Sequence, residues 1–267
     1  MPDILEVRQL RKTYGEFVAV DDVGFALPER GSLAVVGESG SGKTTTARMI
    51  AGLERPTGGR IFVAGEERRP GRARAGQRRA RGRQVQLVFQ DPYSSLDRRQ
   101  RVGDALAEAV ALHRPLRGQE LGERVAELLD MVGLDERQAA ALPKALSGGQ
   151  RQRVALARAL AAEPRVLILD EAVAALDVSI QAQILGLLAD IRASTGTALL
   201  FITHDLGAVR HVSDEVLVMR GGKVVEQGAV TEVLGRPRHP YTQRLLDSIP
   251  KPGWSPRRRA RDMDGAA

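Results

Sequence analysis

A glycine-rich loop near the start of the chain limits the possible folds more than any other segment. Residues 37–44 read Gly-Glu-Ser-Gly-Ser-Gly-Lys-Thr, which matches the phosphate-loop pattern GxxxxGK[ST] in full. The apolar run 33–36 precedes the loop, and helix-forming residues follow it. A strand, a glycine loop and a helix in this order surround a phosphate with backbone N–H groups and a helix N-terminus. The loop therefore predicts a nucleoside triphosphate site in an α/β fold.

The residue types in the loop each suit a phosphate ligand. Glycines let successive backbone N–H groups turn inward, Lys43 neutralises the β- and γ-phosphates, and Thr44 offers its hydroxyl to Mg²⁺. We expect the following residues to contact the nucleotide: Gly37, Glu38, Ser39, Gly40, Ser41, Gly42, Lys43, Thr44 and Thr45.

A second apolar run, residues 166–169, ends in Asp170 and Glu171. A strand of this kind places Asp170 at the carboxyl edge of the sheet, where it can hold Mg²⁺ through water. Glu171, one residue further on, can accept a proton from an attacking water. A strand end of this sort is by itself more often a solvent-facing turn, but together with the phosphate loop it indicates a catalytic site.

Strands alternate with helices along the rest of the chain, which favours a parallel α/β sheet. Strands are expected at 61–64, 85–89, 166–169 and 197–203. The pattern is helical from 104 to 135, and further helices are expected after Gly149 to about 162 and at 179–194. A 3.6-residue apolar period is clear at 121–132 and 179–194. The first 27 residues read as further strands separated by turns. A mostly helical segment interrupts the sheet.

Composition removes several classes of protein. The 267 residues contain no cysteine, so disulfides, zinc–thiolate sites and cysteine-bound iron–sulfur clusters are excluded. The longest stretches without a formal charge, 178–189 and 193–204, have twelve residues each, fewer than the roughly 18 to 20 that a membrane helix needs. The N-terminus lacks the pattern of a secretory signal, so we expect the chain to work in the cytoplasm.

The net charge of +7 raises the question of a nucleic-acid partner. Only five of the 40 basic residues are lysines, and arginine, alanine and glycine are abundant, which is typical of a GC-rich genome. We therefore expect no specific nucleic-acid binding. The arginine-rich run from Arg68 to Arg83 is expected to be an exposed, mobile insertion between strands.

Three further segments carry a resemblance to a known family. Leu146-Ser-Gly-Gly-Gln150 stands before an expected helix, Ala175-Leu-Asp177 follows Glu171, and Ile202-Thr-His-Asp205 ends an expected strand. With the phosphate loop and the Asp-Glu strand, in this order and spacing, they resemble an ABC-type ATPase from about Ile4 to Pro250. The resemblance implies the ABC-ATPase variant of the P-loop NTPase fold, with a parallel sheet core, an antiparallel β subdomain and an inserted helical subdomain.

The resemblance also implies ligands and residue roles. ATP and Mg²⁺ are the expected cofactors, with Thr44, Gln90 and Asp170 at the metal. Glu171, His204 and Gln90 form the expected catalytic set, and Tyr14 is expected to stack on adenine. In the family, two such domains face each other head to tail, so the LSGGQ segment of one chain closes the ATP bound to the other. The residues implied at that shared site are Ser147, Gly148, Gly149, Gln150 and Asp177.

Residues 86–98, 176–185 and 239–246 resemble the dipeptide, oligopeptide and nickel import ATPases, and more closely the second of their two ATPase subunits. This implies two transmembrane permease subunits and a second ATPase subunit as partners, and indirectly an extracytoplasmic solute-binding protein. It also implies a peripheral position on the cytoplasmic face of the cell membrane. Which solute is transported, and whether the ATPases form a homodimer or a heterodimer of siblings, stays open.

Two departures from the family pattern affect these expectations. Ala172, Val173 and Ala174 replace a proline and two hydroxyl residues, and we expect a working but slower site because the carboxylates are kept. Arg98 replaces a proline close to where the family's ATPases touch the membrane subunits, so this substitution bears on the fit to a permease and not on ATP binding.

The sequence argues against two other classes of ABC protein. A chromosome-organising or DNA-repair ATPase carries a long coiled-coil insertion, whereas only about 125 residues separate Lys43 from Asp170. A ribosome-associated ABC protein has two cassettes, and this chain has one. An exporter ATPase stays possible but lacks the His-Pro-Tyr-Thr segment at 239–242. We expect one ATPase domain over residues 1–250, with its helical subdomain at about 91–163, and a basic, disordered tail at 251–267.

Overall fold

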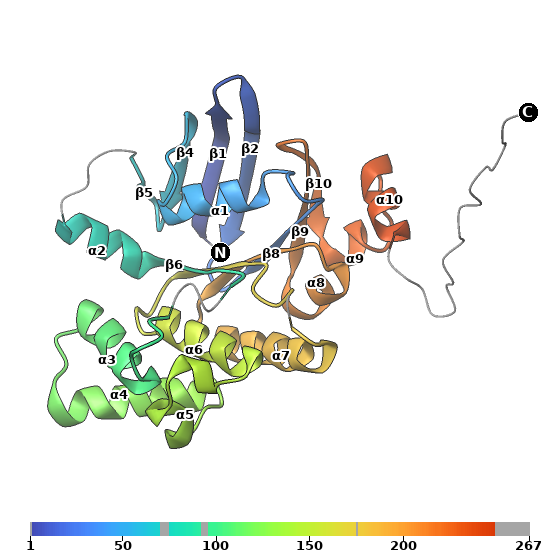
Figure 1. The fold of residues 1–267 in the computed structure, drawn as a ribbon. Helices are drawn as coiled ribbons and strands as arrows, with labels where there is room; N and C mark the ends of the chain where they lie inside the picture. The colour runs from blue at the N-terminus through green and yellow to red at the C-terminus, as the bar shows by residue number, and fades with distance from the viewer. Residues whose placement is uncertain (1, 70–74, 92–95, 175, 249–267) are drawn as a thin grey trace, which may run out of the picture.

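The computed structural model describes residues 2–69, 75–91, 96–174 and 176–248. Over these residues the chain forms two sheets with helices packed around them (Figure 1). The strands are β1 (Asp3–Tyr14), β2 (Phe17–Pro28), β3 (Ser32–Val36), β4 (Gly58–Val63), β5 (Glu66–Glu67), β6 (Val85–Val88), β7 (Val166–Asp170), β8 (Ala198–Thr203), β9 (Glu215–Arg220) and β10 (Lys223–Ala229). The helices are α1 (Lys43–Ala51), α2 (Ala75–Gln84), α3 (Val102–His113), α4 (Gly118–Met131), α5 (Glu136–Ala140), the 3₁₀ helix η2 (Pro143–Ala145), α6 (Gly148–Leu160), α7 (Val178–Thr195), α8 (Leu206–Val212), α9 (Val230–Val233) and α10 (Pro240–Asp247).

The larger sheet has the strand order β10-β9-β3-β8-β7-β6 in the described part of the chain. The pairs from β9 to β6 are parallel, and β10 alone pairs antiparallel, with β9. Parallel neighbours require long crossovers, and helices supply them here. The predicted parallel α/β core is confirmed.

The smaller sheet is antiparallel, with the order β2-β1-β4-β5. Leu5 of β1 pairs with Leu27 of β2 on one side and with Val63 of β4 on the other, and all three side chains are buried. The predicted antiparallel subdomain is confirmed, and its strands β1 and β2 are longer than the apolar positions alone indicated.

Each central strand is buried on both faces, which explains its unbroken apolar sequence. Val166 and Ile168 of β7 pack with α1 and the antiparallel sheet, while Leu167 and Leu169 pack on the opposite face with α6 and α7. Figure 1 shows α1 on one side of the larger sheet and the green to yellow helices α3–α7 on the other. A third cluster, which includes Tyr241, joins β9 to α8, α9 and α10.

Helices α3 to α6 lie between β6 and β7 in the sequence and pack together below the larger sheet in Figure 1. In α4 the apolar stripe buries Leu128 and Leu129 against α3 and α6. The proposed division into one domain over residues 1–250, with a helical subdomain at about 91–163, stays a prediction. The predicted tail at 251–267 lies outside the described residues.

The arginine-rich run differs from the expectation of an exposed, mobile insertion. Residues 75–84 form helix α2, and Arg68 before it is half-buried. Its guanidinium donates to Ile50 O at 3.3 Å, Arg81 O at 3.0 Å and Gln84 Oε1 at 3.4 Å. Burial, and to a smaller extent the charge of Arg81, lowers the pKa of Arg68 to about 10, so the group stays charged at neutral pH. Arg68 therefore links α1 to α2, and this part of the expectation was wrong; residues 70–74 lie outside the described residues.

We expect Arg68→Ala to lower the free energy of unfolding by about 1 to 3 kcal/mol, because three acceptors lose a donor inside a packed region. The matched control is Arg79→Gln, an exposed arginine of α2, which should change stability by less than about 0.5 kcal/mol. Urea unfolding of both variants measures the difference. Equal stability of the two variants would mean that Arg68 does not hold the segment.

Candidate functional site

The expected site residues gather at the carboxyl edge of the larger sheet. The phosphate loop follows β3, Asp170 ends β7 and Thr203 ends β8, with His204 directly after it. Because β3, β8 and β7 are parallel neighbours, the segments that follow them leave the sheet at the same edge.

The phosphate loop lies tightly against neighbouring backbone. Gly37 has φ 151° and Gly42 has φ 102°, both in the region that favours glycine. A Cβ atom at Gly37 would stand 2.2 Å from Met219 O, and one at Gly42 would stand 2.6 Å from Ala19 O. Any side chain at either position would push the loop away from β9 or β2, so these two glycines set its path.

Lys43 lies within the loop and is only 4% exposed. Its Nζ donates to Gly37 O at 2.7 Å, Glu38 O at 2.8 Å and Ser41 Oγ at 3.4 Å. Burial lowers the pKa of Lys43, and the carboxylates of Glu171 and Asp170 oppose that change. A desolvated ammonium held by neutral acceptors is suited to an anionic ligand, whose charge would compensate it.

Thr44 and Asp170 meet across the sheet edge. Thr44 Oγ1 donates to Asp170 Oδ1 at 2.9 Å, and Asp170 is 5% exposed. Burial raises the pKa of Asp170, with a smaller contribution from the neighbouring Glu171. One hydroxyl and one carboxylate are hard oxygen donors, and Mg²⁺ in nucleotide sites takes few protein ligands beside phosphates and water. The donor set therefore fits Mg²⁺.

Glu171 has a left-handed backbone, with φ 50°, directly after β7. The backbone N–H of Glu171 donates to Ile202 O at 2.9 Å, and this bond holds the residue against the neighbouring strand β8. His204 Nδ1 lies 3.5 Å from Glu171 Oε1, and the histidine side chain is 59% exposed. The structure thus brings a partly buried carboxylate and an accessible imidazole together beside Asp170.

Hydrogen bonds fix the two residues on either side of His204. Thr203 Oγ1 accepts the N–H of Asp205 at 3.0 Å, and Asp205 Oδ1 caps α8 through Gly207 N at 2.8 Å. Gln181 Nε2 of α7 donates to the other carboxylate oxygen of Asp205 at 2.7 Å. An aspartate before an apolar helical run is an N-cap signal, so the cap of α8 was predictable, whereas the Gln181 contact was not.

Ser147 and Gln150 form a reciprocal cap at the start of α6. Ser147 Oγ accepts the N–H of Gln150 at 3.2 Å, and Gln150 Oε1 accepts the N–H of Ser147 at 2.9 Å. The cap uses only a lone pair of the Ser147 hydroxyl, so its proton stays available for another acceptor. Ser147 and Gly148 are exposed, while a Cβ at Gly149 would stand 2.6 Å from Ile180 Cγ2.

The remaining predicted residues lie on other segments of the chain or are exposed. Tyr14 ends β1, is 48% exposed, and has Lys12 Nζ at 4.7 Å from its ring centroid. Gln90 is exposed beyond β6, and Asp177 is exposed as the N-cap of α7. Within the described ranges, no hydrogen bond or ion pair joins these three side chains, or Ser147, to the phosphate loop. Ser39, Gly40 and Thr45 belong to the loop and the first turn of α1, where Ser39 and Gly40 are exposed.

The residues after Glu171 are apolar and buried. Ala172 is 2% and Val173 1% exposed, and both belong to the hydrophobic cluster on the α6 and α7 side of the sheet. Apolar packing therefore surrounds Ala172 and Val173, the positions at which the resemblance led us to expect a proline and a hydroxyl residue. The expected effect on the rate of hydrolysis stays a prediction, and Ala175 lies outside the described residues.

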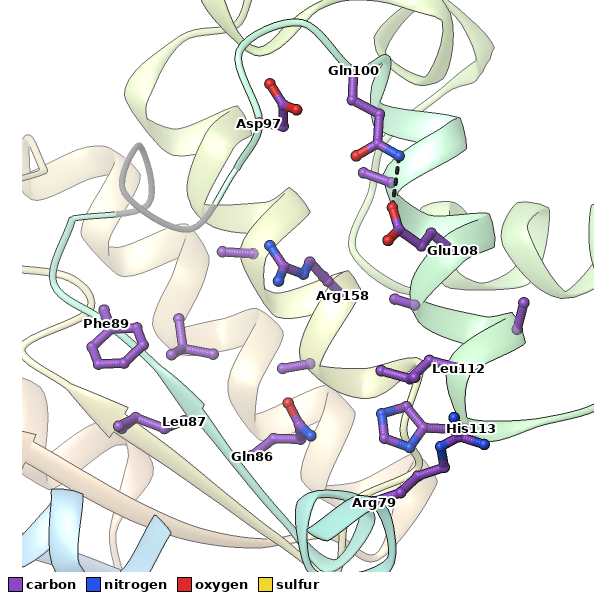
Figure 2. Close-up of a pocket in the computed structure, with 16 residues that line it drawn as sticks. Arg79, Gln86, Leu87, Phe89, Asp97, Gln100, Glu108, Leu112, His113 and Arg158 are labelled. Carbon is purple, nitrogen blue, oxygen red and sulfur yellow. Dashed lines mark hydrogen bonds between the residues drawn. The ribbon is translucent and has the colours of Figure 1, made fainter. Parts of the chain in front are cut away.

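A pocket of about 810 Å³ lies between β6, α3 and α6 (Figure 2). Leu87 and Phe89 line it on the strand side, and Leu112 and His113 on the side of α3, with Arg158 of α6 between them in Figure 2. At the rim, Gln100 Nε2 donates to Glu108 Oε2 at 2.9 Å. None of the lining residues belongs to the phosphate loop, so this pocket is a separate feature of the surface.

Family models match two parts of the chain. Residues 20–174 match the family described as ABC transporter, and residues 225–265 match the family described as oligopeptide/dipeptide transporter, C-terminal region. The first match includes the phosphate loop, Gln90, residues 147–150, Asp170 and Glu171, and it leaves out Tyr14, Asp177 and His204.

The chain is also similar to individual ATP-binding proteins of transporters and to a solved ATP-binding cassette. The chain is 46% identical over 243 residues to the di/tripeptide transport ATP-binding protein DppF of Pseudomonas aeruginosa, covering 91% of this chain and 75% of that protein. It is 47% identical over 248 residues to the oligopeptide transport ATP-binding protein OppD of Mycobacterium tuberculosis, covering 91% of this chain but only 39% of that protein. The solved structure of the ATP-binding cassette MJ0796, a dimer bound to ADP and Pi after hydrolysis, superposes with a TM-score of 0.76 and 28% identity, over 85% of this chain and 98% of that one.

We expect Asp170→Asn to stabilise the nucleotide-free protein while removing activity. Since the folded pKa of Asp170 lies above its ordinary value, the charged carboxylate lowers stability at neutral pH, and this penalty fades only as pH falls through the folded pKa. The amide keeps an oxygen for Thr44 but carries no charge. Thermal unfolding at neutral pH should show a gain of roughly 2 to 4 °C, the shift that about 1 kcal/mol gives at this size.

The same variant should hydrolyse ATP roughly 10² times more slowly or worse, because the expected carboxylate ligand of Mg²⁺ would be lost. Repeating the melt near pH 4 supplies the control, since the gain should shrink there. A variant less stable than the parent at neutral pH would contradict the cost assigned to the buried carboxylate.

Proposed function

Because this chain belongs to the ABC transporter family, whose ATP-binding subunits hydrolyse ATP, we propose that it couples that hydrolysis to the uptake of peptides or similar small solutes through separate permease subunits. The assignment to peptides is supported by the match at residues 225–265 and by the likeness to the di/tripeptide transport protein of Pseudomonas aeruginosa, three quarters of which the chain covers. Whether the importing assembly holds a homodimer or two sibling ATPases is a separate question.

The proposed roles follow from the geometry at the sheet edge. Lys43 and the N–H groups of the loop bind the phosphates of ATP, and Thr44 with Asp170 holds Mg²⁺. Bound there, Mg²⁺ would neutralise charge on the phosphate oxygens. Glu171 accepts the proton of the attacking water, and His204, 3.5 Å from Glu171, contacts the γ-phosphate. Gln90 reaches the metal and water from the end of β6, and Tyr14 stacks on the adenine.

The site is proposed to be completed by a second ATPase subunit. Ser147 and Gly148 are exposed at the N-terminus of α6, a position suited to an anionic group, and the Ser147 hydroxyl keeps its proton for donation. These donors would reach the γ-phosphate bound to the facing subunit, with Asp177 at the seam. The dimeric form of MJ0796 supports such an arrangement.

The permease subunits are proposed to contact the surface around the pocket beside β6. The apolar lining of the pocket includes Phe89 and the exposed Leu112. His113 also lines the pocket, and burial, with the nearby charges of Arg83 and Arg79, lowers its pKa, so the imidazole is neutral at neutral pH. Among the described residues no helix is long and apolar enough to cross a bilayer. On this proposal the protein sits peripherally at the cytoplasmic face of the membrane, and a solute-binding protein acts only through the permeases.

The observation that carries the proposal is the pairing of Thr44 with Asp170 and of His204 with Glu171 at one edge of the sheet. Its direct test is Glu171→Gln. We expect this variant to bind ATP as the parent does and to turn over roughly 10² to 10⁴ times more slowly, the usual worth of a positioned base.

Steady-state phosphate release measures the turnover, and binding of a fluorescent ATP analogue measures the affinity. Glu66→Gln, a change at an exposed residue of β5, is the matched control and should leave both unchanged. Hydrolysis near the parent rate in Glu171→Gln would remove Glu171 from the role of base.

The shared site gives a second test. Lys43→Ala and Ser147→Arg should each be inactive alone, because every composite site in either homodimer lacks one part. Mixing the two variants should restore hydrolysis, since a mixed dimer holds one complete site. Random pairing makes about half of the dimers mixed, so independent sites predict recovery near a quarter of the parent rate, and coupled sites predict less.

Crosslinking establishes that mixed dimers are present in the mixture. If the chain pairs only with a sibling ATPase, one variant is placed in each partner. An active monomer would contradict the shared site.

A further inference from the structure

The hydroxyl of Tyr241 reaches the phosphate loop from the far end of the described chain. Tyr241 Oη accepts the backbone N–H of Glu38 at 3.0 Å, although 203 positions separate the two residues. Tyr241 lies in α10, within the His-Pro-Tyr-Thr segment, and none of the catalytic roles described above uses it.

This contact acts on one peptide unit of the loop. The bond between Gly37 and Glu38 presents its N–H to Tyr241, and its carbonyl, Gly37 O, accepts from Lys43 Nζ at 2.7 Å. Glu38 O accepts from the same ammonium at 2.8 Å. The tyrosine hydroxyl and the lysine ammonium therefore hold the two sides of this peptide, so the orientation of the peptide and the position of Lys43 are linked. Gly37 has no side chain to restrict the peptide, which makes an external hold more effective.

The surroundings of Tyr241 hold its hydroxyl in place. The Tyr241 side chain is 3% exposed and packs with the cluster that joins α8, α9 and β9. The start of α10 is fixed by His239 Nδ1, which accepts the N–H of Tyr241 at 3.1 Å. Glu226 of β10 accepts the N–H groups of Arg238 at 2.8 Å and His239 at 3.1 Å. A phenol delivered from such a rigid position costs little entropy when it makes its bond.

Packing alone does not require a tyrosine at this position. A phenylalanine of the same shape would fill the cluster as well, but it would leave the N–H of Glu38 without this acceptor. The hydroxyl of Tyr241 therefore bonds to the loop, and its ring packs in the core.

We propose that Tyr241 is a positioning residue for the nucleotide site, which holds the Gly37–Glu38 peptide in the orientation that binds phosphate and so couples α10 to nucleotide occupancy. The proposal rests on the proposed role of the loop and of Lys43 in binding ATP. Because coupling between two sites is reciprocal, a hydroxyl that favours the binding conformation of the loop must itself be held more firmly when nucleotide is bound.

The test is Tyr241→Phe, which removes one oxygen and keeps the ring. Loss of one hydrogen bond to the loop should raise the Kd for a fluorescent ATP analogue and the KM for ATP by about 2- to 10-fold, with kcat within about 2-fold of the parent. Leu245→Ala is the matched control, because Leu245 also belongs to α10 and packs against the same cluster without touching the loop. It should lower Tm while leaving Kd and KM unchanged.

Hydrogen exchange gives a second measurement that a purely structural role would not alter. In the parent, saturating nucleotide should slow exchange of the amides of α10, and this protection should be reduced in Tyr241→Phe. Parent-like Kd and KM in Tyr241→Phe would overturn the proposal, as would an equal rise of Kd in Leu245→Ala, which would show general loosening of α10. Failure of the parent itself to bind the ATP analogue would count against the proposed function of the loop, and the two failures are therefore distinguishable.

Discussion

The parallel pairing of β3, β8 and β7 is the constraint on which the site depends. β8 lies between the other two, and its register sets Thr203 opposite Val36 and Ile202 opposite Asp170. The loop after β3 and the residues that end β7 and β8 therefore leave the sheet at the same level. Since all three strands are buried on both faces, a slip of one strand would expose apolar side chains, and core packing thereby fixes the site geometry.

The site holds two charged side chains, Lys43 and Asp170, in buried positions that disfavour charge. Burial acts against the charged forms of both Lys43 and Asp170, lowering one pKa and raising the other, and their mutual attraction offsets this only in part. ATP with Mg²⁺ would reverse both effects, because phosphate favours the ammonium and the metal favours the carboxylate. Part of the free energy of ATP binding would thus come from removing the unfavourable free energy of burying the charges of Lys43 and Asp170.

The sequence predicted those parts of the fold that depend on local pattern. The apolar runs at β3 and β7 and the glycine loop were sufficient to predict the parallel core, because each carries its own periodicity or turn chemistry. Arg68 was misread because its acceptors are mostly backbone carbonyls, which no side-chain pattern reveals. The contacts of Gln181 with Asp205 and of Tyr241 with Glu38 join residues distant in sequence, so they depend on the assembled fold and had no local signal.

The start of α6 and the phosphate loop are held in their conformations by different contacts. The loop is shaped by the remainder of the chain, through close contacts of Gly37 and Gly42 with β9 and β2 and through Tyr241. Ser147 and Gln150 instead shape each other through a local cap. Among the described residues, no hydrogen bond joins either side chain to the chain's own phosphate loop. A segment that is locally preorganised and exposed suits a ligand presented by another molecule. On the proposed assignment, each chain would therefore carry two halves of different sites, and catalysis would require a neighbour even though folding does not.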